Sequence, residues 1–430
     1  MNLRVTLRLC LALILWAAAA GWVLAEDGDA PGNPGAPGRI LVLLRMPPQH
    51  LRPGGDTGDS YGDSAGRNAR RRIADRVAKD HGLTLVGDWP MPLLGLDCFI
   101  MRTSTGQSPG VAAANVSHDR GVAWAEPMQL YYAQGDASKT APPTTAKTSN
   151  GASHNDPLFL TQPAARGWRL AELHEIATGK NVRVAVIDSG VEKNHPDLAG
   201  QIDLSQDFTS RRRVLAEQHG TGVAGVIAAR ADNGLGIVGI APGVRLMALR
   251  ACWQAEASAA TVCDSLSLAQ ALHFAIAHHA QVINLSLSGP PDPLLGRLID
   301  IALVQGATVV GAVDPNLPVG GFPASHPGVV AVRTDSDATP ISGIVSAPGR
   351  DVPTTQPGGR WFLVNGSSYA AAHISGLFAL LRERGGGSGV SALVAVRPGG
   401  EAVNACATLL RASGPCDCGC AHDFAANARR

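Results

Sequence analysis

Between about residue 155 and residue 381, short runs rich in β-branched residues alternate with alanine-rich stretches of helical spacing. Two of the runs read VRVAVID and VINLSLS, and one of the helical stretches reads TGVAGVIAAR. Apolar runs of this kind are typical of strands buried on both faces, as in a parallel sheet covered by helices. The alternation therefore predicts an α/β unit at residues 155–382, with a parallel sheet and helices on both faces.

A smaller unit is predicted at residues 39–133. Its patterns follow the order strand, helix, strand, strand, helix, strand, and the last strand reads VAWAEPMQLYY. This order is the split βαβ arrangement, which predicts a small α+β, ferredoxin-like unit. The arrangement by itself indicates no function, because it hosts many.

Segments of different composition flank the two units. Residues 1–25 carry two arginines, an apolar run of about 17 residues and a small-residue exit at Ala25, which is typical of a secretory signal peptide. An uncleaved membrane anchor is the alternative, for which the run is short. Residues 26–38 and 134–154 are rich in Gly, Pro and small polar residues and predict linkers. Residues 383–430 form a Gly-rich and Cys-rich C-terminal extension.

Charge and cysteine content bear on partners and compartment. Lys and Arg number 36 and Asp and Glu 35, so the formal net charge is +1 and no overall field would attract nucleic acid or acidic lipid. We expect no nucleic-acid partner, and no membrane partner after removal of the signal. Secreted or periplasmic residence suits disulfides among the eight cysteines, and Cys252 with Cys263 is a candidate pair.

Three residues occupy places where such a sheet builds chemistry. Asp188 ends the run VRVAVID, while His219 and Ser368 each stand at the start of a helix of small residues. A serine hydroxyl becomes a nucleophile when an imidazole takes its proton, and the imidazole needs a carboxylate to fix its tautomer. Each residue alone has a structural alternative: a turn cap, a loop histidine or a helix N-cap. Together they predict an Asp-His-Ser catalytic triad.

The segments around these residues resemble those of the subtilisin family of serine peptidases. AVIDSGVEKNHPDL is similar to the family's Asp segment, HGTGVAGVIAA to its His segment, INLSLSG to its substrate-binding strand and NGSSYAAAHISG to its Ser segment, in the family's order. The resemblance covers most of residues 155–381. It implies a secreted endopeptidase that hydrolyses protein or peptide substrates through an acyl-enzyme.

The same resemblance implies roles for two further regions. Leu287, Ser288 and Gly289 would form the strand edge on which an extended substrate pairs. Residues 39–133 would be a propeptide that templates folding and inhibits the site until it is removed.

One departure from the family pattern bears on activity. Where the family has an Asn that donates to the oxyanion, this chain has Asp314. Three interpretations stay open: Asp314 is protonated by burial and donates, Asn316 reaches in, or the oxyanion hole consists of the Ser368 backbone amide alone. The alternative function is therefore a catalytically weak or inactive subtilisin-fold protein that binds peptides.

Other departures lie around the same site. Val313 and Ser288 both replace glycine, which predicts a narrow pocket and a preference for small side chains next to the cleaved bond. Tyr369 stands where the family has Met. None of these changes touches the triad.

Metal ligands are suggested at two places. Asp197, in HPDL, matches a family calcium ligand, so the resemblance allows a structural calcium ion, although no cofactor is required for the chemistry. The C-terminal segment PCDCGCAH offers a zinc-ligand set: Cys416, Cys418, Cys420 and His422. In an exported chain, disulfides that include one to Cys406 are the expected use of these cysteines.

Overall fold

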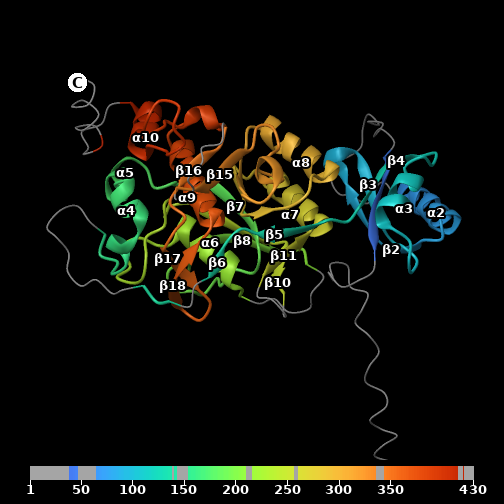
Figure 1. The fold of residues 1–430 in the computed structure, drawn as a ribbon, viewed down its shortest axis with the longest axis horizontal. Helices are drawn as coiled ribbons and strands as arrows, with labels where there is room; N and C mark the ends of the chain where they lie inside the picture. The colour runs from blue at the N-terminus through green and yellow to red at the C-terminus, as the bar shows by residue number, and fades with distance from the viewer. Residues whose placement is uncertain are drawn as a thin grey trace, which may run out of the picture.

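The structure is a computed structural model that describes residues 38–46, 64–137, 140–142, 154–209, 216–255, 260–335, 343–414 and 420. The predicted signal peptide at residues 1–25 lies outside the described residues. Figure 1 shows a small unit, drawn in blue, against one side of a larger one. Among the described residues, none of the helices combines the length and apolar character needed to span a bilayer.

The small unit is an antiparallel sheet with two helices. Its elements are β1 (Arg39–Arg45), α2 (Ser64–Asp80), β2 (Thr84–Met91), β3 (Leu96–Arg102), α3 (Pro109–Val116) and β4 (Val122–Pro127). The strand order is β2-β3-β1-β4, and every neighbouring pair is antiparallel. This confirms the predicted ferredoxin-like arrangement.

Each face of this sheet is buried against a different part of the molecule. Alternate residues of a strand point to opposite faces. Ile40 and Val42 belong to a core shared with α2 and α3, whereas Leu41 and Leu43 belong to a core shared with helices of the larger unit. The small unit therefore uses its open sheet face to dock.

The predicted last strand, residues 122–132, was wrong as a single element. It is divided into β4 and β5 (Leu130–Ala133), and β5 pairs with strands of the larger unit. Pro127 ends β4 and has no N–H to donate. The chain then leaves the first sheet and enters the second unit.

The larger unit is built on a seven-stranded sheet in which all neighbouring strands are parallel. Its order is β16-β15-β14-β12-β7-β9-β8. The strands are β7 (Arg183–Asp188), β8 (Ile202–Asp207), β9 (Arg245–Arg250), β12 (Val282–Leu285), β14 (Thr308–Ala312), β15 (Val330–Thr334) and β16 (Val345–Ala347). The prediction of a parallel sheet at residues 155–382 is confirmed.

Helices cover both faces of this sheet, as predicted. Val184 and Val186 of β7 pack toward a core shared with α6 (Gln218–Ala228) and α9 (Ser367–Glu383). Ala185 and Ile187 pack toward a core shared with α7 (Ser265–Ala277) and α8 (Pro293–Val304). Smaller helical elements are η2 (Pro92–Leu94), η3 (Phe159–Thr161), α4 (Pro163–Gly167), α5 (Leu170–Ile176), η4 (Pro318–Gly320), η5 (Val390–Ala392) and α10 (Ala405–Ser413).

The small unit docks on α7 and α8. The ring of Trp89 meets that of His273 edge-on at 5.4 Å between centroids, and the Arg297 guanidinium lies 3.9 Å from the centroid of Trp124. Asp264 and Asp292 cap the two helices through their side chains, which fixes where each helix begins.

Two disulfides are present. Cys252 bonds to Cys263, which confirms the predicted pair, and Cys406 of α10 bonds to Cys420. The second bond engages one cysteine of the predicted zinc set; Cys416, Cys418 and His422 lie outside the described residues. The α10 residues Ala405 and Leu409 belong to the core around α9, so this part of the C-terminal extension packs on the larger unit.

Candidate active site

The three predicted triad residues lie at one edge of the large sheet. Asp188 is the last residue of β7, His219 is the second residue of α6 and Ser368 is the second residue of α9. All three are buried. The carboxyl ends of parallel strands and the starts of the helices that follow them meet at this edge, which explains why residues so distant in sequence lie close together.

Asp188 and His219 are joined directly. The Nδ1 atom of His219 lies 2.8 Å from Asp188 Oδ1 and 3.0 Å from Oδ2. Ser189 N donates to Asp188 Oδ1 at 2.7 Å. Because a carboxylate accepts, Nδ1 carries the proton and Nε2 is left as the base.

The start of α6 approaches the turn after Asp188 closely. Gly220 N donates to Ser189 Oγ at 3.0 Å. A Cβ atom on Gly220 would lie 2.3 Å from the carbonyl oxygen of Ser189, so glycine is required there. This approach holds His219 against Asp188.

Ser368 does not hydrogen-bond His219 in this arrangement. Its Oγ donates to the carbonyl oxygen of Ser286 at 2.9 Å and accepts from Gln134 N at 3.0 Å. The Nε2 atom of His219 is buried and has no hydrogen-bond partner within the part of the chain that the structure describes. Asp188 and His219 are therefore paired, whereas the Ser368 hydroxyl is turned toward the chain segment that occupies the site.

That segment is β5, which leaves the small unit and runs between two strands of the larger one (Figure 1). It pairs antiparallel with β11 (Thr261–Asp264) on one side and with β13 (Leu287–Ser288) on the other. β11 itself pairs with β10 (Cys252–Gln254), to which it is linked by a disulfide. The segment thus adds a strand between two edges of the larger unit, which is a recognised way of binding an extended peptide.

The predicted peptide-binding edge faces this strand. Leu287 pairs with Ala133, Ser288 pairs with Tyr132, and a Cβ on Gly289 would lie 2.5 Å from the ring of Tyr131. The Tyr131 hydroxyl reaches Asp292 Oδ2 at 3.3 Å and the carbonyl oxygen of Pro290 at 3.2 Å.

The chain continues across Ser368. Gln134 N lies 3.4 Å from the carbonyl oxygen of Ser286, and Ser368 N donates to the carbonyl oxygen of Gln134 at 3.0 Å. After Gly135, β6 (Asp136–Ala137) pairs antiparallel with β18 (Arg360–Asn365), which pairs in turn with β17 (Val352–Gln356). The Gln134–Gly135 peptide bond therefore lies beside the Ser368 hydroxyl with strand pairing on both sides.

Asp314 lies in a turn just after β14. Its Oδ1 accepts from Asn316 N at 2.8 Å and from Asn316 Nδ2 at 3.0 Å. The side chain is half-buried, and Asn316 is exposed. Burial therefore does not support the first interpretation, and the side-chain amide of Asn316 is engaged with Asp314. The remaining interpretation, a hole made by the Ser368 amide, agrees with the contact from that amide to Gln134.

Ser288 and Val313, which were predicted to narrow the pocket, both lie close to Gly320. Ser288 Oγ donates to the carbonyl oxygen of Gly320 at 3.2 Å, and a Cβ on Gly320 would lie 3.1 Å from Val313. The side chain of Gln134 folds back along β5, where its Nε2 donates to the carbonyl oxygen of Tyr132 at 3.0 Å.

Asp197 does not offer a fitting calcium site. Its Oδ1 accepts from Asn233 Nδ2 at 2.9 Å, and its Oδ2 accepts from Ile237 N at 3.0 Å and Trp361 Nε1 at 2.7 Å. A cation would have to replace N–H donors that already point at both oxygens. These N–H groups cannot coordinate Ca²⁺, which requires oxygen ligands.

Three other side chains lie close enough together to be considered as metal ligands. His154, Asp156 and Asp232 bring ligand atoms within 4.8 Å of one another. Both oxygens of Asp156 already accept from the backbone N–H groups of Asp232 and Asn233, and His154 bonds Asp232 at 3.0 Å. The possible ligand atoms of these side chains are therefore already largely hydrogen-bonded within the protein.

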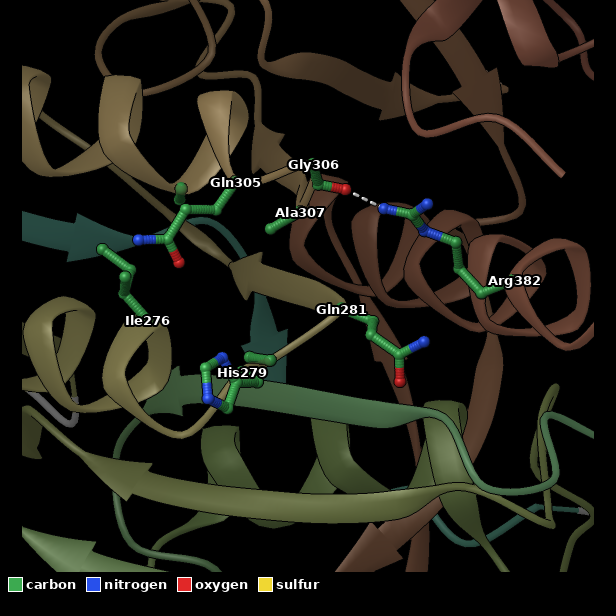
Figure 2. A pocket seen from close by; sticks show the side chains of 9 residues that line it. Ile276, His279, Gln281, Gln305, Gly306, Ala307 and Arg382 are labelled. Carbon is green, nitrogen blue, oxygen red and sulfur yellow. Dashed lines mark hydrogen bonds between the residues drawn. The ribbon is translucent and has the colours of Figure 1, made fainter. Parts of the chain in front are cut away.

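A cavity of about 300 Å³ lies elsewhere (Figure 2). Its lining includes Gln281 and Ala307, which directly precede β12 and β14, and Arg382, whose guanidinium donates to the carbonyl oxygen of Gly306. The amino ends of the strands are the edge opposite Asp188. The cavity is therefore not part of the triad site.

The family resemblance implied that residues 39–133 inhibit the site, but sequence reasoning did not identify which residues fill it. Tyr131, Gln134 and Gly135 fall at a predicted unit boundary, where strand residues give way to the small polar residues QGD. That signal marks a boundary but identifies no partner.

Comparisons with known proteins agree with the fold. Subtilisin NAT from Bacillus subtilis subsp. natto is 34% identical over 226 residues, which is 47% of this chain and 56% of that protein. Subtilisin from Bacillus pumilus is 34% identical over 226 residues, which is 47% of this chain and 78% of that protein. The crystal structure of fervidolysin from Fervidobacterium pennivorans, a keratinolytic enzyme related to subtilisin, matches with a TM-score of 0.65 at 21% identity. It covers 91% of this chain and 62% of that one, and at this identity it shows the fold alone.

The aligned region spans little more than half of subtilisin NAT. Residues 179–393, half of the chain, match the subtilase family, Peptidase S8. This protein belongs to the subtilase family.

Proposed function

We propose that this protein is a serine endopeptidase made as a precursor, which cleaves its own Gln134–Gly135 bond. The observation that carries the proposal is the position of Gln134. The carbonyl oxygen of Gln134 accepts from Ser368 N at 3.0 Å, and the backbone N of Gln134 donates to Ser368 Oγ at 3.0 Å. Pairing of β5 and β6 with the larger unit supports the reading of residues 130–137 as a bound substrate.

The chemistry requires one rotation of the Ser368 hydroxyl toward His219. His219 Nε2 then takes the hydroxyl proton, Oγ bonds to the carbonyl carbon of Gln134, and Asp188 balances the imidazolium. The bond to Gly135 N breaks as that nitrogen receives the proton from His219. Water then attacks the acyl ester, which releases the Gln134 carboxylate and restores Ser368.

The Ser368 backbone N–H would stabilise the oxyanion of this reaction. Removing the Asn donor from subtilisin costs roughly 100- to 1000-fold in turnover. With Asp314 at that position, the proposed enzyme is a slow one.

Labelling tests the proposal directly. The wild-type chain should react with a fluorophosphonate probe and should give a new N-terminus at Gly135, identified by mass spectrometry. The Ser368→Ala precursor should do neither, and cleavage of this variant at Gln134–Gly135 would overturn the proposal.

Inhibition by the small unit follows from the same placement. The small unit docks on α7 and α8 and fills the site with β5, so after cleavage it would remain bound as an inhibitor. Secretion is part of the proposal, supported by the signal-like residues 1–25 and by two disulfides, which persist in oxidising compartments.

A weak or inactive peptide-binding protein is the second candidate function. It is favoured by Asp314, whose side chain accepts hydrogen bonds from Asn316, and by the contact of Ser368 Oγ with Ser286. It predicts an intact precursor and no fluorophosphonate labelling at acid or neutral pH.

A further inference from the structure

We propose that Tyr369 restricts the residue after the cleaved bond to glycine, so that the peptidase acts on sequences with glycine directly after the scissile bond. The inference rests on the proposed function and adds a substrate class to it. Its basis is the space around Gly135.

Gly135 has no room for a side chain. A Cβ atom there would lie 2.8 Å from Cε2 of Tyr369 and 2.9 Å from the carbonyl oxygen of Asn365. Cβ atoms in proteins essentially never approach other heavy atoms within 3.0 Å. Even alanine would therefore require one of these neighbours, or the chain itself, to move.

The ring of Tyr369 is held in place. Tyr369 is fully buried. On its other edge, a Cβ on Gly222 would lie 3.3 Å from Cε1, and the centroid of the His219 ring lies 5.7 Å from that of Tyr369. In a close-packed interior, movement of this ring would disturb α6 and His219.

The carbonyl of Asn365 is equally constrained. Asn365 lies in β18, between β17 and β6, and pairs with Asp136. The same pairing anchors the chain one residue beyond Gly135. Ring and carbonyl therefore close on Gly135 from two directions.

A shift of the substrate chain could not make room for a larger residue at position 135, because the shift would move the scissile bond away from Ser368. Gln134 is fixed by Ser368 N on one side of Gly135, and Asp136 is fixed by strand pairing on the other. A larger residue between these anchors would pull the Gln134 carbonyl from the amide that stabilises the oxyanion. The restriction should therefore lower kcat and not only weaken binding.

Precursor processing provides the first test. Gly135→Ala should slow cleavage between residues 134 and 135 by roughly 10- to 100-fold, the effect of overpacking a rigid site. Gly110→Ala is the matched control, because a Cβ there meets only Ser108 Oγ at 3.9 Å, and it should process within about twofold of wild type. Tyr369→Met combined with Gly135→Ala should recover cleavage at this bond.

Peptides provide the second test and do not depend on folding of a variant. One peptide copies residues 130–137 and its partner carries alanine in place of Gly135. Wild-type enzyme that has processed itself should prefer the glycine peptide by the same roughly 10- to 100-fold in kcat/KM, with most of the difference in kcat. In Tyr369→Met enzyme the ratio should fall toward one.

Equal cleavage of the two peptides by the wild-type enzyme would overturn the role of Tyr369 and leave the peptidase proposal standing. An unchanged ratio in an active Tyr369→Met enzyme would also overturn it. If the wild-type chain cleaves neither peptide and takes no fluorophosphonate label, the proposed function itself fails.

Discussion

At the scale of single residues, Asp314 stands where the family resemblance implies an asparagine that donates to the oxyanion. Its Oδ1 accepts from both the backbone and the side chain of Asn316, so the residue also shapes the turn after β14. In the proposed mechanism the oxyanion therefore has one donor, the Ser368 amide, where the family resemblance implies two.

Asp314→Asn should raise kcat on peptide substrates at neutral pH, by up to roughly 100-fold. Asparagine keeps an oxygen that can accept from Asn316 and adds an N–H₂ group that can donate to the oxyanion. Steady-state kinetics on the self-processed variant measures the effect. Turnover equal to or below wild type would mean that the side chain at 314 does not reach the reacting carbonyl.

A second residue-scale prediction concerns Asp292. The Tyr131 hydroxyl contacts Oδ2 of Asp292, and Tyr131 lies three residues before Gln134. A peptide that contains Leu-Tyr-Tyr-Ala-Gln should therefore exceed its counterpart with phenylalanine at the first tyrosine by roughly fivefold in kcat/KM. Asp292→Asn retains the cap on α8 and should reduce this ratio toward one. A ratio that persists in the variant would assign the preference to the carbonyl of Pro290.

At the scale of elements, the contact between β4 and α8 carries two neighbouring acidic groups. Glu126 of β4 is buried, and its pKa is raised to about 8 by burial first and then by the charge of Asp292. Trp124 Nε1 donates to Glu126 at 2.9 Å, which opposes this rise. The protonated form of Glu126 is therefore the one that suits the docked small unit.

Docking should weaken as pH rises. A carboxyl whose pKa is higher in the docked state stabilises docking fully below its ordinary pKa near 4.5, and this contribution is lost as pH rises through about 8. We expect the cleaved small unit to dissociate faster at pH 9 than at pH 6, as followed by size-exclusion chromatography. Glu126→Gln should flatten this pH dependence, and a dependence as steep as that of wild type would place its source elsewhere.

At the scale of the whole molecule, two cores meet at the large sheet, and the small unit extends one of them. α9 runs through the other core and carries both Ser368 and a buried histidine, His373. His373 Nδ1 donates to the carbonyl oxygen of Tyr369 at 2.7 Å, and burial lowers its pKa from 6.5 to about 4. Stability and the active site therefore share one helix.

His373 should make the fold sensitive to acid. A histidine whose pKa is lowered by folding leaves stability intact above its ordinary pKa of 6.5 and destabilises the fold as pH falls toward 4, by about 3 kcal/mol in the limit. Thermal unfolding of the Ser368→Ala precursor between pH 7 and pH 4 measures the loss. His373→Gln in the same background should reduce this loss, and an identical loss would exclude His373 as its source.

Local sequence patterns were sufficient for most of the elements and for proposing the three triad positions. Strand and helix periodicities are local, so the parallel sheet, its covering helices and the ferredoxin-like unit were predictable. Asp188, His219 and Ser368 were recognisable as candidates because each ends a strand or opens a helix. The strand order and the division of residues 122–132 between two sheets were not predictable, because they depend on pairing between distant segments.

Local sequence patterns did not predict the contacts that fill or close the site. Trp361 donates a hydrogen bond to Asp197, which is 164 positions away in the sequence, and Gln134 contacts Ser368, which is 234 positions away. By itself the sequence determined which residues are candidates for acyl transfer and on which kind of sheet they stand. Only the tertiary structure decided that the chain's own residues 130–137 lie in the site and that Tyr369 closes on Gly135, because such contacts depend on packing between distant segments and on no local pattern.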